Sequence, residues 1–275
     1  MSAAREYQFT RRDFDYLRRI SNQRTGIVVS DDKFDMFYSR LARRVRALGL
    51  SNFADYCDYL EAPENAEEIT ELVNAVTTNL TSFFREKHHF EFLAERALGE
   101  AIDRNRATRR IRIWSAGCST GEEPYSIAMV LAENADRLRG WDVQILASDI
   151  DSNVLEQAAR GVYPAARVEG LPASRLKRFF QKGRGRQAGK VRVKDALRDL
   201  IRFEQINLME PLGLDTQDIV FCRNVIIYFD KPTKVGLMDR FAGVLVDGGY
   251  LIIGHSESLY QVTSRFELIG HTVYR

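Results

Sequence analysis

The sequence has few cysteines and no long apolar run, and each shortage excludes a class of protein. Its three cysteines, Cys57, Cys118 and Cys222, lie far apart and form no C-x-x-C pair. A disulfide framework and a zinc site are therefore not expected, and a reducing cytoplasm fits best. No stretch approaches the roughly 18 apolar residues that span a bilayer, and the first residues lack the apolar core of a signal peptide. We expect a cytoplasmic protein that is not inserted into a membrane.

The sequence also has no large excess of positive or negative residues. The 275 residues include 40 Lys and Arg against 38 Asp and Glu, a formal net charge of +2. This balance gives no general argument for binding to nucleic acid. The length suffices for one large domain and a smaller one.

The first 78 residues have the pattern of a small helical domain. The second predicted helix has apolar residues at three- and four-residue spacing, Phe34, Phe37 and Leu41 among them, so one of its faces is buried. Thr10, Ser30 and Ser51 are placed to begin the first three helices, and Gly26 and Gly49 to end the first two. The predicted helices cover residues 11–23, 31–48, 51–60 and 65–77.

After a linker and helix at 79–109, the pattern changes to that of an α/β domain over 110–275. Short apolar runs alternate with helical segments, which is typical of a parallel sheet covered on both faces. The predicted strands include 111–114, 143–147, 219–222 and 250–253, and the helices include 124–137, 154–160 and 232–246. The last residues, 266–274, are expected to form a hairpin at one edge of the sheet.

One segment interrupts this alternation. Residues 181–194 carry six Lys or Arg, three Gly and no acid, which predicts a β-hairpin with its tip at Gly183-Arg184-Gly185. A solvated loop without a role is the alternative. We expect an inserted antiparallel β-subdomain at about 163–200.

The most informative motif follows the first predicted strand. The sequence Trp114-Ser-Ala-Gly-Cys-Ser-Thr-Gly-Glu-Glu123 places glycines at a strand-to-helix turn, where a ligand can approach the backbone. Acids in the first helical turn would repel a pyrophosphate but suit a cation such as the ammonium of S-adenosylmethionine. We therefore expect Glu123 or Glu122 at the methionine end of that cofactor. The second strand ends in Asp149, whose carboxylate can accept from ribose hydroxyls, and Asp151 can cap the next helix.

An alternative for the same loop is a serine hydrolase. Gly117 to Gly121 matches G-x-S-x-G, with Ser119 in the place of the nucleophile and His255 or His271 later in the chain. The acid at Asp149 and the glutamates directly after the loop are unexplained by that chemistry.

Further polar side chains follow other predicted strands and are expected at the same crevice. Asn207 and Leu208 follow the alternating segment 201–205, and Arg223, Asn224 and Tyr228 follow the strand at 219–222.

Five motifs together resemble those of the chemotaxis protein methyltransferases, the CheR family. They are TTNLTSFFRE from Thr77, the loop WSAGCSTGEEPYS, ASDID, FCRNVIIYFD and GHSES. The resemblance runs from Phe9 to Tyr274. It implies a Rossmann-like S-adenosylmethionine-dependent methyltransferase domain with an inserted β-subdomain, preceded by a small all-α domain. It also implies methyl transfer from S-adenosylmethionine to receptor glutamates, giving S-adenosylhomocysteine and needing no metal.

The resemblance also implies roles for single residues. Arg85 and Tyr228 would orient the acceptor carboxylate. The cofactor would contact Asn79, Thr81, Arg85, Glu123, Asp149, Asn207, Leu208, Arg223 and Asn224. A non-catalytic scaffold that binds S-adenosylmethionine or receptors is the remaining alternative.

Two partner surfaces complete the expectations. Arg40, Arg43 and Arg44 share a face of the second helix, and Arg40 and Arg46 match family positions implicated in docking the helical cytoplasmic domain of transmembrane chemoreceptors. In some family members the β-subdomain binds a C-terminal receptor pentapeptide, and Gly183-Arg184-Gly185 resembles that tethering type. The arginines could instead form a solvated basic face or follow the phosphates of RNA, but no aromatic stacking platform accompanies them.

Overall fold

The computed structural model describes residues 5–275, and the chain divides into two compact units. The first comprises the N-terminal residues through Thr78 together with the short segment Tyr228–Thr233. The second comprises Asn79–Ile227 and Lys234–Arg275. Within the described residues, no helix is long and apolar enough to cross a membrane.

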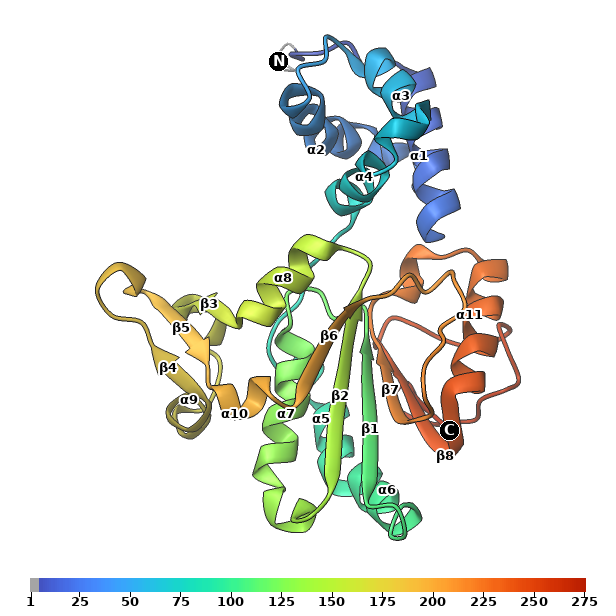
Figure 1. Cartoon of the computed structure of the whole chain (residues 1–275). Helices are drawn as coiled ribbons and strands as arrows, with labels where there is room; N and C mark the ends of the chain where they lie inside the picture. The colour runs from blue at the N-terminus through green and yellow to red at the C-terminus, as the bar shows by residue number, and fades with distance from the viewer. Residues whose placement is uncertain (1–4) are drawn as a thin grey trace. The chain divides into compact units, whose positions relative to one another are not determined.

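The first unit is helical, as its sequence pattern predicts (Figure 1). Its core is formed by aromatic and aliphatic side chains that recur at helical spacing, including Phe14, Leu17, Phe37 and Leu41. The helices are α1 (Arg11–Thr25), α2 (Phe34–Ala47), α3 (Phe53–Glu61) and α4 (Glu68–Val76).

The helix ends in this unit match the predicted signals in part. Thr10 forms a capping box with Asp13, and Gly26 ends α1 in the left-handed conformation at φ 73°. Ser30 begins only a 3-10 turn and makes no capping bond. Asn52, rather than Ser51, caps α3 because its side-chain oxygen accepts from the Asp55 amide at 2.9 Å.

The second unit is built on a seven-stranded sheet in the order β6-β2-β1-β7-β8-β10-β9. The first five strands in this order are mutually parallel, and β10 and β9 form the predicted antiparallel hairpin at the edge. The strands are β1 (Arg110–Ala116), β2 (Asp142–Asp149), β6 (Ile201–Gln205), β7 (Gln217–Cys222), β8 (Leu245–Ile253), β9 (Leu268–Gly270) and β10 (Val273–Tyr274).

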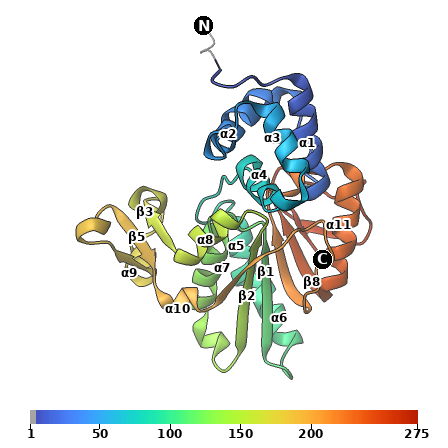
Figure 2. The same ribbon diagram turned by 45° about the horizontal axis from the view of Figure 1, so that its top comes forward.

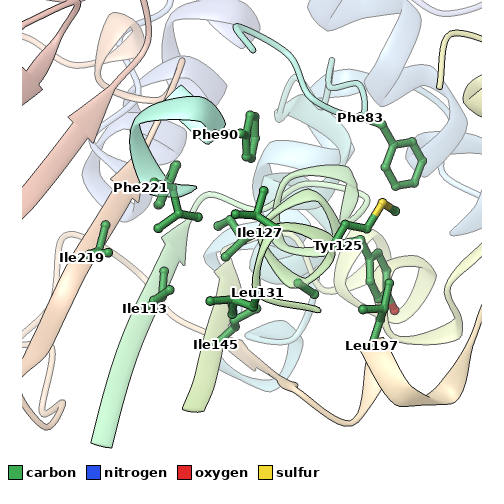
Figure 3. Packing of buried hydrophobic residues seen from close by; sticks show 14 of the residues in the cluster. Phe83, Phe90, Ile113, Tyr125, Ile127, Leu131, Ile145, Leu197, Ile219 and Phe221 are labelled. Atoms are coloured by element: carbon green, nitrogen blue, oxygen red, sulfur yellow. The ribbon is translucent and has the colours of Figure 1, made fainter. Parts of the chain in front are cut away.

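Helices cover the sheet on both faces. One continuous helix, with a π-turn between α5 and α6, packs with α7 on the face that presents Ile113, Ile145 and Ile219 (Figure 3). On the opposite face, Phe241 of α11 meets the Trp114 ring edge to face, with the centroids 5.4 Å apart. The helices are α5 (His88–Phe92), α6 (Leu98–Arg104), α7 (Glu122–Glu133), α8 (Ser152–Arg160) and α11 (Lys231–Val244).

The insert is a separate three-stranded sheet that stands beside the main sheet (Figure 2). Its strands pair antiparallel, which confirms the predicted hairpin at 181–194 and adds β3, a three-residue strand that the sequence pattern did not single out. Its elements are β3 (Val162–Pro164), α9 (Ala173–Phe179), β4 (Phe180–Lys182), β5 (Lys190–Val193) and α10 (Asp195–Arg198). Phe83 packs against its Tyr163 and Phe180 rings, with centroids 5.1 and 5.5 Å away.

Candidate active site

The carboxyl ends of the parallel strands lie at one edge of the sheet, where open α/β sheets bind ligands. Asp149 is the last residue of β2, and Arg223 directly follows β7. Ile206 follows β6, and its amide donates to the Asp149 carbonyl at 3.1 Å. This hydrogen bond holds the start of the segment that contains Asn207 and Leu208 beside the end of β2.

The loop between β1 and α7 is a tight turn with two glycines and Ser119 in the left-handed region, Ser119 at φ 50°. Gly117 and Gly121 have φ values of 83° and 95°. The amides of Gly117 and Cys118 both donate to the Ser148 carbonyl at 2.8 Å. A Cβ on Gly117 would lie 2.4 Å from Cγ2 of Val225, so this loop packs tightly under the turn that follows β7.

Asp149 holds this loop from the end of β2. One carboxylate oxygen accepts from the Ser119 amide at 2.8 Å, and the other accepts from the Asp151 amide at 3.0 Å. Burial raises the pKa of Asp149 to about 6, although the backbone hydrogen bonds oppose the shift. The side chain thus has a structural task in addition to the predicted contact with a ribose.

Asp151 caps α8, as predicted. Its Oδ1 accepts from the amides of Asn153 and Val154, at 3.0 and 3.4 Å. Its Oδ2 accepts from Nδ2 of Asn79 at 2.7 Å, and the Asn79 carbonyl accepts from the Ser119 hydroxyl at 3.1 Å. These bonds attach the start of the linker to the glycine loop.

The structure separates the two glutamates at the start of α7. Glu122 is fully buried, and Arg167 and the Thr120 hydroxyl already bind it. Glu123 accepts from the Ser115 hydroxyl at 2.7 Å and from Nη1 of Arg223 at 2.9 Å, and it keeps 8% of its surface exposed. Glu123 is therefore the better candidate for a ligand's cationic group.

Arg223 links the strand end to the linker. Its Nη2 donates to the Arg85 carbonyl and lies 3.2 Å from Oε2 of Glu86. Its Nε is buried and has no hydrogen-bond partner among the described residues. A bound ligand with an acceptor atom could satisfy this buried donor at the end of β7.

The linker residue Arg85 lies between two residues in strained conformations. Phe84 and Glu86 have positive φ values of 53° and 56°, in the left-handed region that non-glycine residues seldom adopt. The guanidinium of Arg85 donates to the Leu80 carbonyl at 2.9 Å, and its side chain is 32% exposed. It is a partly exposed cation attached to an otherwise buried charged network.

Glu86 is a residue of this network that the sequence analysis did not assign. Burial would raise the pKa of Glu86, but the hydrogen bond from His255 and the charge of Arg223 lower it to about 2. Its carboxylate is bound by Nδ1 of His255 at 2.7 Å and by the His255 amide at 3.0 Å. Arg85 and His89 lie close to Glu86 in the sequence, but the side chains of Arg223 and His255, which also bind its carboxylate, lie more than 130 positions away.

Two further residues were missed. Arg167, at the base of the β-subdomain, donates to the Thr81 carbonyl at 3.1 Å and pairs with Glu122. Glu257, in the GHSES segment, accepts from backbone amides after β7. Arg167 lies in no motif of the sequence, and Glu257 lies in the GHSES motif, which does not indicate which backbone amides it binds.

The hydrolase alternative finds no support in the geometry. The Ser119 hydroxyl donates to the Asn79 carbonyl, and within the described residues no hydrogen bond joins a histidine to it. The neighbouring Cys118 is buried, and burial raises the pKa of its thiol well above the usual value, which disfavours the reactive thiolate.

The predicted docking arginines and Tyr228 belong to the first unit. Arg40 donates to the Val76 and Thr77 carbonyls at 2.7 and 2.6 Å. Arg44 pairs with Glu68, a buried acid that also accepts from the Tyr56 hydroxyl at 2.9 Å. Arg43 is exposed, and Arg46 is exposed beside Glu6. Half-buried Tyr228 accepts from the Val28 amide through its carbonyl, at 2.8 Å.

Comparison with known proteins identifies the class. The profile of the CheR methyltransferase SAM binding domain matches residues 79–275, and that of the CheR methyltransferase all-alpha domain matches 12–77. The glycine loop, the acids at Glu123 and Asp149, and the unsatisfied Arg223 donor fit this cofactor. The protein is a methyltransferase that uses S-adenosylmethionine. More narrowly, the chain belongs to the CheR methyltransferase family.

Curated relatives are similar to this chain over nearly its whole length. Chemotaxis protein methyltransferase 2 of Pseudomonas aeruginosa is 46% identical over 98% of this chain and 94% of its own length. The chemotaxis protein methyltransferases of Salmonella typhimurium and Escherichia coli are 44% and 43% identical, each over 94% of this chain and 89% or 90% of their own length.

Proposed function

We propose that this protein transfers the methyl group of S-adenosylmethionine to glutamate side chains of methyl-accepting chemoreceptors, forming glutamyl methyl esters. The names of the relatives support a role in chemotaxis. The observation that carries the proposal is Arg85, a partly exposed cation whose carbonyl is tied to the buried Arg223–Glu123 pair. Such a cation can attract an acceptor carboxylate to the edge of the cofactor site.

Each predicted contact then has a chemical task. Glu123 would hold the ammonium of the cofactor, Asp149 the ribose hydroxyls, and Asn207 with Leu208 the adenine. Asn79, Thr81, Arg223 and Asn224 would complete this pocket. Arg85 and Tyr228 would orient the incoming carboxylate.

The reaction needs alignment more than acid–base chemistry. S-adenosylmethionine supplies an electrophilic methyl group, and a glutamate with a pKa near 4.3 is already an anion at neutral pH. No general base is required. Holding two charged reactants in line and partly desolvated can contribute up to about 7–11 kcal/mol, which is the task we assign to Arg85 and Tyr228.

The test of this assignment is Arg85→Ala. We expect methyl transfer to receptors to fall about a hundredfold or more, because the acceptor loses its orienting cation, while circular dichroism shows a folded protein. Arg178→Ala is the matched control, since Arg178 also donates to a backbone carbonyl, that of Ala132, but has no proposed role in the site. Near-normal turnover in Arg85→Ala would refute the assignment.

We also propose that the β4–β5 hairpin binds the C-terminal peptide of a receptor. Its tip holds Gly183, where a Cβ would lie 2.0 Å from the Gln187 carbonyl oxygen, and Gly185, with φ at 55°. The segment 181–194, which contains this tip, carries six Lys or Arg and no acid. Titration calorimetry with an aromatic-containing receptor tail peptide should give measurable heat, and no heat at about 1 mM peptide would remove the idea.

A further inference from the structure

Glu257 is a buried acid at the edge of the site that the proposed chemistry does not use. It follows β8 and is 5% exposed. Its Oε2 accepts from the amides of Gly254, at 2.6 Å, and Asn224, at 2.8 Å, and its Oε1 accepts from the amide of Ile227 at 3.2 Å. One carboxylate thus joins the segments that follow two neighbouring strands, β7 and β8.

The segment that Glu257 holds is strained. Asn224 has a φ of 59°, in the left-handed region. The 3-10 turn Ile226–Tyr228 begins directly after Val225. A residue keeps such a conformation only when surrounding contacts enforce it, and the Glu257 carboxylate supplies bonds at both Asn224 and Ile227.

Two glycines close the space around this segment. A Cβ on Gly254 would lie 2.4 Å from Nδ2 of Asn224 and 2.9 Å from its backbone nitrogen. A Cβ on Gly117 would lie 2.4 Å from Cγ2 of Val225. The turn is therefore packed between the glycine loop and the end of β8, and small shifts of its backbone are resisted on both sides.

The hydrogen-bonding pattern requires a carboxylate. Both oxygens of Glu257 accept, and hydrogen bonds from amides to an ionised acceptor are stronger than neutral ones. A glutamine has one acceptor oxygen, so its NH2 group would face a backbone N–H and leave that donor unpaired. Burial raises the pKa of Glu257 above its ordinary value, and the bonds from Gly254 and Asn224 oppose this shift.

We propose that Glu257 is a positioning residue for methyl transfer: its carboxylate fixes the backbone of Asn224–Ile227 and thereby sets the place of Asn224 for the cofactor. The inference rests on the proposed role of Asn224. Glu257 touches neither reactant and acts through the backbone of the turn.

The test compares Glu257→Gln with Asp218→Asn. Asp218 is a matched control because it is also buried and accepts from a backbone amide, that of Arg112 at 2.9 Å, but at the amino end of β7. In Glu257→Gln we expect the Kd for S-adenosylhomocysteine to rise about tenfold and kcat to fall by a similar factor, because a buried donor is left unpaired. Asp218→Asn should lower the melting temperature with an unchanged Kd.

Hydrogen exchange gives a readout that does not depend on activity. The amides in peptides covering 222–229 should exchange faster in Glu257→Gln than in the unmodified protein, and not in Asp218→Asn. If Glu257→Gln does not fold, Gly254→Ala displaces Asn224 with the carboxylate intact and should show the same loss of cofactor affinity. Unchanged Kd, kcat and exchange in a folded Glu257→Gln would overturn the proposal. If the unmodified protein bound no S-adenosylhomocysteine, the proposed function would fail, and hydrogen exchange alone would still decide whether Glu257 holds the turn.

Discussion

At the scale of single residues, Asp149 combines a structural and a predicted ligand-binding task. Its carboxylate fixes the glycine loop through the Ser119 amide and lies at the end of β2. Because its pKa is about 6 rather than 3.8, it changes charge in an accessible pH range. Because the pKa of Asp149 is higher in the folded protein than in the unfolded chain, protonation of Asp149 favours the folded state. Its contribution to the free energy of unfolding is complete below pH 3.8 and is lost as the pH rises through about 6.

Cofactor binding should have the opposite pH dependence, because ribose hydroxyls donate best to the ionised carboxylate. We predict that the Kd for S-adenosylhomocysteine rises as the pH falls through about 6, by up to about tenfold per pH unit for one proton. Calorimetry between pH 5 and 8 measures this. Asp149→Asn should bind weakly with a flat profile, and an equal slope in that variant would show that another group titrates.

Residue roles were predictable from the sequence where a local motif carried them. Asp151 directly precedes a helix, and this position predicted the cap that it forms. Glu86 and Glu257 lie within two of the motifs, but their contacts were not predictable, because Glu86 binds His255 and Glu257 binds the Asn224 amide from segments distant in the sequence. Such contacts exist only after the strand ends have been brought together.

At the scale of elements, the arginines of α2 have two different tasks: some stabilise the helical unit, and others are exposed, where a partner can contact them. Arg40 donates to the carbonyls at the end of α4, and Arg44 pairs with the buried Glu68. Their sequence spacing predicted a shared face, but these two side chains hold the helices together. Arg43 and Arg46 remain exposed, and we assign most of the proposed docking to them.

Reversing the charges of Arg43 and Arg46 to Glu should therefore weaken receptor methylation. We expect KM for the receptor to rise several-fold, and more at low salt, because exposed charges are screened over about 8–10 Å. Binding of S-adenosylhomocysteine should not change. The control reverses Arg12 and Arg19, two exposed arginines of α1. Equal KM values in both double variants would count against docking through α2.

Element boundaries were predictable where a cap or an alternating pattern marked them. Thr10 and Gly26 delimit α1, and the alternating run before Asn207 became β6. The strand β3 was not singled out, because three residues ending in Pro164 carry too little periodicity. Its place follows from pairing with β5.

At the scale of the whole molecule, the fold class was predictable because alternating strands and helices leave few arrangements. The parallel strands, the edge hairpin and the inserted β-subdomain are all present. The expected chemistry came from the resemblance of five motifs to one family, and four of these motifs lie at the ends of parallel strands. The identity of the side chain that receives the methyl group is the part of the proposed function that an experiment must establish.

Transfer of radiolabelled methyl groups to receptor-containing membranes tests the central claim most directly. The protein is incubated with S-adenosylmethionine labelled in its methyl group, and the receptor band is then treated with mild base. We predict that the receptor becomes labelled and that base releases the label as methanol, because an ester of glutamate is base-labile. A label that resists base, or binding of the cofactor without any transfer, would contradict the account.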